Sequence, residues 1–247
     1  MKVLVAGKGG VGKTTLAAVV ARTLARRGLV VTAIDGDSNP NLAIALGLGE
    51  EYRGVRSIRN ELGGKSDPHP IAELTRDFGV AAPDGVRLMQ TGEVKKPSEG
   101  CLCCGSHMTL RDVFGRLPSG ADHWVVADLE AGVNDVLWAY PQPGDAMIIV
   151  TDPSMKSLEV GKRLRHVAEE LGLTTVIVVA NQFENPGDLD RASLAFPGLP
   201  VVAVPDDADV RRADRDGRSP LDSSPGAAGV LALAEIADRL IGAATAA

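Results

Sequence analysis

Lys8-Gly9-Gly10-Val11-Gly12-Lys13-Thr14-Thr15 is the stretch that decides the fold of this 247-residue chain. Together with Gly7 it completes the pattern G-x-x-x-x-G-K-T, between an apolar run at residues 3–6 and a helical run that starts at Leu16. Glycines let successive backbone N–H groups curve around an anion without obstruction by side chains. The pattern therefore predicts a phosphate-binding loop between a first strand and a first helix.

The residue types in this loop predict individual contacts to a nucleotide. Lys13 would reach the outer phosphates, and the Thr14 hydroxyl would ligate Mg²⁺. The helix that begins here would point its positive end at the phosphate charge. The expected nucleotide contacts in the loop are Gly9, Gly10, Val11, Gly12, Lys13, Thr14 and Thr15.

Composition favours one α/β domain spanning residues 1–247. Aromatic residues make up only 3% of the chain, so Val, Leu, Ile and Ala must form the core, as in a parallel sheet covered by helices. The net charge of −6 disfavours non-specific attraction to nucleic acid or anionic lipid. We find no segment that resembles a signal peptide and no apolar stretch long enough to span a bilayer. The three cysteines favour reduced thiols over disulfides. We therefore expect a cytoplasmic protein.

Short apolar runs without polar alternation alternate with helical stretches along the chain. Such runs are typical of strands buried on both faces. The predicted fold is α/β, a doubly wound, mostly parallel sheet with helices on both faces, as in P-loop NTPases, with ligand sites at the carboxyl ends of the strands. Further strands are expected at 30–34, 87–90, 123–127, 146–150, 175–180 and 201–204, helices at 16–27, 109–117, 157–171, 206–214 and 227–241, short helices and loops at 50–84, and a frayed helix end at 243–247.

Two of the predicted strands end in carboxylates. Asp35-Gly36-Asp37 follows one strand, and Asp128 opens the sequence Asp128-Leu129-Glu130-Ala131-Gly132 after another. Such carboxylates support Mg²⁺ or orient the attacking water in nucleotide hydrolysis, and a following glycine can sense a γ-phosphate. Asp35-Gly36-Asp37 alone is also compatible with a plain turn built from Asp and Gly. The occurrence of both favours a catalytic interpretation.

Lys8, present early in the loop in addition to Lys13, resembles the deviant phosphate loop of the nitrogenase iron protein and the MinD/ParA ATPases. The resemblance implies an ATP-hydrolysing enzyme that forms an ATP-dependent homodimer, in which Lys8 reaches the nucleotide of the partner. It also implies that Asp37 is the catalytic aspartate of switch I and that Asp128 opens switch II. The resemblance further implies that Asn181 contacts the adenine base. It also implies that Pro205 and Asp206 belong to a loop, late in the chain, that lies beside the nucleotide.

Cys101, Cys103 and Cys104 lie within four residues. In extended backbone Cys101 and Cys103 would point to the same side and could hold one metal ion. Two thiolates do not complete a structural site of four ligands, but a two-fold dimer presents the pair twice. His107 lies three residues past Cys104 and could be a further ligand for a soft metal, although we expect it to face the solvent near the start of a helix.

Cys101-x-Cys103, the preceding residues 92–96 and the switch II sequence resemble the CooC-type nickel-insertion accessory ATPases of carbon monoxide dehydrogenase. The resemblance implies nickel or zinc bound by Cys101 and Cys103 between two subunits, and a client enzyme like carbon monoxide dehydrogenase. The predicted function is thus an ATP-hydrolysing metallochaperone. Cys104 and the segment 138–143 depart from this pattern, which leaves the client and the metal open.

Two other functions remain open. One is an ATP-dependent reductase in which Cys101 and Cys103 of a dimer hold a [4Fe–4S] cluster, although the close spacing of the pair counts against it. The other is a positioning or partitioning ATPase of the MinD/ParA type. Residues 227–247 carry one arginine and no basic amphipathic face, so we expect no membrane and no nucleic acid as partner.

Overall fold

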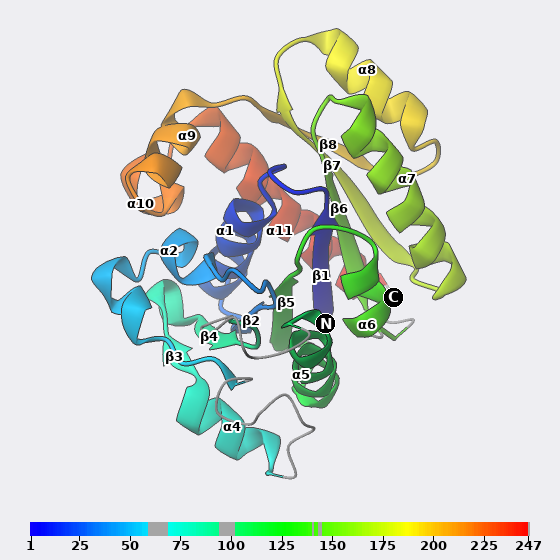
Figure 1. Cartoon of the computed structure of the whole chain (residues 1–247). Helices are drawn as coiled ribbons and strands as arrows, with labels where there is room; N and C mark the ends of the chain where they lie inside the picture. The colour runs from blue at the N-terminus through cyan, green and yellow to red at the C-terminus, as the bar shows by residue number, and fades with distance from the viewer. Residues whose placement is uncertain (59–68, 94–101, 140, 143–144, 247) are drawn as a thin grey trace.

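The central sheet has the strand order β3-β4-β2-β5-β1-β6-β7-β8 in the described part of the chain (Figure 1). The structure is a computed structural model that describes residues 1–58, 69–93, 102–139, 141–142 and 145–246, with the backbone alone at 102–105 and 246. All neighbouring strands are parallel except β3, which pairs antiparallel with β4 at one edge. The strands are β1 (Lys2–Gly7), β2 (Val30–Asp35), β3 (Val80–Ala81), β4 (Arg87–Gln90), β5 (His123–Asp128), β6 (Ala146–Thr151), β7 (Thr175–Phe183) and β8 (Val201–Pro205).

Helices cover both faces of this sheet, because successive side chains of its strands point to opposite sides. Val3 and Val5 of β1 belong to one core cluster, and Leu4 and Ala6 belong to the other. The first cluster lies under α1 (Lys13–Arg26), α2 (Leu42–Leu46) and α11 (Ala228–Ala246). The second lies under α4 (Ile71–Phe78), α5 (Leu102–Arg116), α6 (Asn134–Ala139), α7 (Met155–Glu170) and α8 (Pro186–Ala195).

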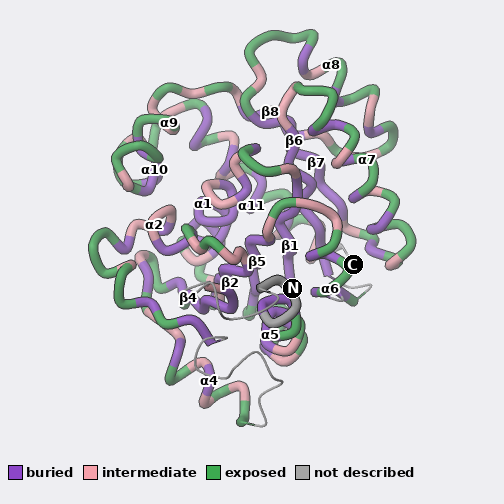
Figure 2. The backbone as a smooth tube through the Cα atoms, in the orientation of Figure 1, coloured by how far each residue is buried: buried purple, intermediate pink, exposed green. Residues whose placement is uncertain are grey.

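The strands form the buried interior, and the outer surfaces of the helices are exposed (Figure 2). All six residues of β1 are buried, which fits its place between β5 and β6 at the centre of the sheet. The remaining short elements are α9 (Ala208–Arg215), α10 (Pro220–Ser223) and the 3-10 helices η1 (Gly49–Gly54) and η2 (Pro83–Gly85). No helix in the described ranges is long and apolar enough to cross a membrane.

Arg22 of α1 is a buried cation that joins distant segments of the first face. Its side chain is 2% exposed and donates to Asp84 at 2.6 Å and to both carboxylate oxygens of Asp222 at 2.7 Å. It also donates to the carbonyl oxygen of Leu46 at 3.2 Å. A buried charge requires such partners. The guanidinium group of Arg22 therefore holds three segments against α1, namely η2, the last residue of α2, and α10.

The predicted strands and the doubly wound topology are confirmed, whereas several helix boundaries were wrong. Helix α5 begins at Leu102, well before residue 109. Helix α11 continues to Ala246, so the alanine-rich end is part of a regular helix and not a frayed terminus. The sequence analysis did not predict α2, α6, α8, α10 or the edge strand β3.

Candidate functional site

The loop between β1 and α1 has the backbone that an anion site requires. Gly10 and Gly12 have φ angles of 82° and 88°, in the left-handed region that favours glycine. Helix α1 has no side-chain cap at its first turn and no acidic residue there. Its first N–H groups are therefore available to a phosphate, and the helix dipole favours negative charge at this position.

A cleft of about 650 Å³ opens above this loop. Its wall continues from the loop to the ends of β7 and β8 and then to α9. The cleft therefore lies at the carboxyl edge of the sheet, which is where ligands bind in folds of this kind. Ten predicted site residues line the cleft, namely Gly9, Gly10, Gly12, Lys13, Thr14, Thr15, Asp37, Asn181, Pro205 and Asp206.

Three predicted site residues lie in or beside the loop without lining the cleft. Val11 is fully buried, and its carbonyl oxygen accepts a hydrogen bond of 2.7 Å from Nδ2 of Asn181. The carbonyl oxygen of Lys8 accepts from Nζ of Lys13 at 3.3 Å. Asp128 is 1% exposed and lies at the end of β5, beneath the cleft.

Lys13 and Asp128 form the charged centre of the site. Burial lowers the pKa of Lys13, and the nearby Asp128 opposes that effect. Burial raises the pKa of Asp128, whereas a hydrogen bond from Thr14 and the charge of Lys13 lower it. Within the described residues, Oδ1 of Asp128 has no hydrogen-bond partner although it is buried. An unpartnered carboxylate oxygen beside a threonine hydroxyl is a donor set that suits Mg²⁺, so the residues fit the expected ion.

Asp35 is a buried carboxylate whose importance the sequence analysis missed. It lies directly opposite Asp128 in the β2–β5 register. Burial raises its pKa, and the charge of Asp128 raises it further. Its oxygens accept hydrogen bonds from the backbone N–H of Leu42 at 2.8 Å and of Asp37 at 3.2 Å. Asp35 therefore positions the loop after β2, and its place as the last residue of a buried strand was the available signal.

Asp37 is the carboxylate of this loop that reaches the cleft. Its Oδ1 accepts a hydrogen bond of 2.8 Å from the backbone N–H of Asn39, which fixes the side chain at the turn. A fixed carboxylate in a phosphate cleft can orient a water molecule for attack.

The loops after β2 and β5 contact each other and the phosphate-binding loop. The Ser38 hydroxyl donates to Oε1 of Glu130 at 3.2 Å. The backbone N–H of Gly132 donates to the carbonyl oxygen of Gly7 at 3.2 Å. Because Glu130 also lines the cleft, a change at the outer phosphate would act on both loops together.

A second part of the cleft wall is formed by Asn181, by the residues that follow β8, and by α9. Asp207 caps α9 and also accepts from the backbone N–H of Gly229 at 2.8 Å, which fixes this segment. Arg215 and Arg218 line the cleft as well, and the sequence analysis did not single them out as site residues. Their cationic side chains favour an anionic ligand.

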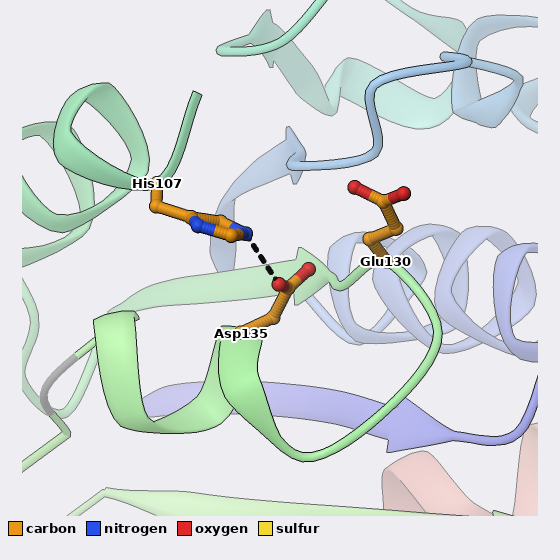
Figure 3. Close-up of side chains that lie close together, drawn as sticks. All are labelled: His107, Glu130 and Asp135. Atoms are coloured by element: carbon orange, nitrogen blue, oxygen red, sulfur yellow. Dashed lines mark ion pairs between the residues drawn. The ribbon is translucent and has the colours of Figure 1, made fainter. Parts of the chain in front are cut away.

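His107 is buried, so the prediction that it faces the solvent was wrong. It is 7% exposed, and its Nε2 lies 2.6 Å from Oδ1 of Asp135 (Figure 3). The imidazole ring also stacks on Trp138, with centroids 5.7 Å apart. The sequence did not reveal this, because Asp135 and Trp138 come from α6, a helix that its periodicity did not predict.

The cysteine prediction falls largely outside the described residues. Cys101 lies outside them, and the structure gives only the backbone of Cys103, in the first turn of α5. The expectation of extended backbone at Cys103 is therefore corrected to helix. Residues in such a turn do not share a side at a spacing of two, so the geometric reason given for the pair does not hold at Cys103.

The loop, the buried lysine and the Thr14–Asp128 contact at the end of a central parallel strand define a P-loop NTPase. Residues 2–221 match the family model described as the CobQ/CobB/MinD/ParA nucleotide binding domain, and the chain belongs to this family. It is a P-loop ATPase.

Individual proteins agree with this assignment. The chain is 30% identical over 243 residues to the carbon monoxide dehydrogenase accessory protein CooC of Rhodospirillum rubrum, with 91% of each chain covered. It is 30% identical over 236 residues to an uncharacterized ATP-binding protein of Methanocaldococcus jannaschii, with 88% and 90% covered. Its fold is similar to that of the septum site-determining protein MinD of Pyrococcus horikoshii, complexed with Mg-ADP, at a TM-score of 0.76, 20% identity and 97% and 95% coverage.

Proposed function

We propose that this chain is an ATP-hydrolysing, dimeric metallochaperone of the cytoplasm that assists the insertion of nickel into an enzyme like carbon monoxide dehydrogenase. The observation that carries the proposal is Cys101-x-Cys103 in a nucleotide-binding chain that is 30% identical to CooC over 91% of each chain. Thiolates are the ligands that soft and borderline metals such as nickel and zinc prefer.

A dimer would complete both sites. Two thiolates from each subunit give four ligands at a two-fold axis. The cleft of one chain is not lined by its own Lys8, which fits the proposed role of this lysine at the nucleotide of the partner. ATP would hold the two subunits together by binding between them.

The proposed hydrolysis uses the described residues for positioning and charge stabilisation. Lys13 and the α1 N-terminus would bind the outer phosphates, Thr14 and Asp128 would hold Mg²⁺, and Asp37 would orient the attacking water. On the base side, Asn181, Pro205 and Asp206 would bind adenine and its sugar.

Contacts within the described chain connect the nucleotide cleft with the helix that contains Cys103. Glu130 lines the cleft, and its carboxylate lies within 4.8 Å of Asp135. Asp135 pairs with His107, one turn after Cys103 on α5. A movement of the switch loops on hydrolysis would thus reach the start of α5, which supports coupling between nucleotide state and metal binding.

Metal analysis of protein purified without oxygen tests the proposal. We expect the cysteines to hold about one nickel ion per two chains in the wild type, and we expect a Cys101→Ser, Cys103→Ser double variant to lose that ion. Cys104→Ser is the matched control, because it removes a neighbouring thiol outside the proposed pair, and it should leave the stoichiometry unchanged. Equal metal content in the wild type and the double variant would refute the proposed site.

The same preparation discriminates the other functions. A strongly coloured protein would indicate a [4Fe–4S] cluster instead of nickel. Retention on anionic vesicles or DNA in the presence of ATP would favour a positioning ATPase. We expect neither, and α11 supports this, because its apolar residues Leu233, Ile236 and Leu240 are buried in the core and not available to a lipid surface.

A further inference from the structure

Three side chains from separate segments meet between the nucleotide cleft and α5. His107 comes from α5, Glu130 from the loop after β5, and Asp135 from the first turn of α6 (Figure 3). One nitrogen or oxygen atom of each lies within 4.8 Å of the other two. The fold therefore brings one imidazole and two carboxylates to one place.

One atom of this group lacks a partner. Asp135 is 4% exposed, and its Oδ1 is paired with Nε2 of His107 at 2.6 Å. Within the described chain, its Oδ2 has no hydrogen-bond partner although it is buried. Such an oxygen is costly to leave without a donor or a cation. Burial raises the pKa of Asp135, and the charge of Glu130 raises it further, while the charge and hydrogen bond of His107 and a hydrogen bond from the backbone N–H of Glu130 lower it.

Contacts around the group restrict the orientation of the three side chains. The Ser38 hydroxyl donates to Oε1 of Glu130 at 3.2 Å. The ring of Trp138 stacks on His107 with an angle of 14° between the planes. A hydrogen bond to a carboxylate, such as that from Ser38, is typical of side chains that bind metal ions, because it fixes the ligand atoms in place.

We propose that His107, Glu130 and Asp135 form a binding site for a divalent first-row transition metal, with one imidazole nitrogen and two carboxylate oxygens as ligands. Magnesium prefers oxygen ligands alone, whereas zinc, cobalt and nickel accept imidazole together with carboxylate. Three protein ligands leave a further coordination position for water or an incoming group. For the ion to enter, His107 and Asp135 exchange their direct contact for bonds to the metal.

This site is separate from the thiol site of the proposed function and does not depend on it. Its ligands all belong to described residues, and its donors are nitrogen and oxygen. An experiment in a chain without cysteines therefore tests it alone, and its failure would leave the proposed nickel site at Cys101 and Cys103 untouched.

The experiment is a titration with Co²⁺ of a variant that carries Cys101→Ser, Cys103→Ser and Cys104→Ser, followed by visible absorption and calorimetry. We expect about one Co²⁺ per chain, displaced by Zn²⁺ but not by an excess of Mg²⁺. His107→Gln in this background should weaken the affinity about tenfold or more. His166→Gln is the matched control, because His166 is an exposed histidine that also pairs with a carboxylate, Glu170, and its loss should change nothing.

Two outcomes would overturn the proposal. One is the absence of Co²⁺ binding in the cysteine-free chain, and the other is equal affinity in the His107→Gln and His166→Gln variants. Circular dichroism checks that each variant is folded. Should a variant unfold, nitrogen NMR of histidine-labelled wild type gives the answer, since Zn²⁺ should shift the imidazole signals of His107 and leave those of His166. Signals of His107 that do not respond to Zn²⁺ would equally overturn the site.

Discussion

Asp128→Asn should stabilise the nucleotide-free protein and at the same time weaken its binding of Mg²⁺ and ATP. Burial raises the pKa of Asp128 from 3.8 to about 7 in the folded chain. The folded protein therefore keeps a proton that the unfolded chain has released. This group contributes no penalty below pH 3.8; stability is lost as the pH rises from 3.8 to about 7, and the loss is constant above that.

The magnitude follows from the same pKa. One pKa unit corresponds to about 1.4 kcal/mol, so the full rise corresponds to about 4 kcal/mol at pH 8. Asparagine removes the charge but still leaves a polar group buried, which costs about 1–2 kcal/mol. We expect the variant to gain about 2 kcal/mol in free energy of unfolding at pH 8 and to lose about 1 kcal/mol at pH 4, where the cost of the buried amide outweighs the small remaining gain.

Urea unfolding of the nucleotide-free protein at several pH values measures this difference. Asp207→Asn is a control for which we expect the opposite change in the free energy of unfolding, because hydrogen bonds from the backbone N–H groups of Gly229 and Asp209 lower the pKa of Asp207. That variant should be less stable than the wild type at neutral pH, with a deficit that shrinks in acid. An Asp128→Asn variant that is less stable than the wild type at pH 8, or whose effect does not vary with pH, would refute the reasoning.

Three further predictions concern single residues. Gly12→Ala should destabilise the protein by about 1 kcal/mol more than Gly10→Ala in urea unfolding. Both positions have positive φ, but only a Cβ at Gly12 would meet Nδ2 of Asn181, at 2.5 Å, and equal losses would count against the described loop. Arg22→Met should cost about 1–3 kcal/mol in the same assay, because Asp84 and Asp222 lose the buried cation between them while Arg26 remains paired with Asp84, and a loss near zero would contradict that network. Lys13→Ala should weaken Mg·ATP binding in calorimetry about tenfold to a hundredfold through the loss of a charged hydrogen bond, and unchanged affinity would show that the phosphates bind elsewhere.

The parts of the fold that could be predicted are those with local causes. Residues 3–6 and the glycines after them are consecutive in the chain, and a buried strand followed by an anion loop needs nothing else nearby. Asp37 and Asp128 could also be placed from the sequence. Each carboxylate follows a predicted strand, and the carboxyl ends of parallel strands meet at one edge of the sheet.

The parts that could not be predicted depend on partners distant in sequence. Nothing near His107 indicates burial, because its contacts come from Asp135 and Trp138 in α6. The raised pKa of Asp35 depends on the β2–β5 register, which sets it opposite Asp128. The early start of α5 at Leu102 had no apolar periodicity to mark it.

In the proposed function, the nucleotide controls metal binding at Cys101 and Cys103. The most direct measurement is the affinity of the wild-type protein for nickel without nucleotide, with ADP, and with an ATP analogue that is not hydrolysed. We expect the affinity to differ between the ATP-bound and ADP-bound forms by about fivefold or more. Equal affinities in all three states would contradict the coupling, even if ATP and nickel each bind tightly.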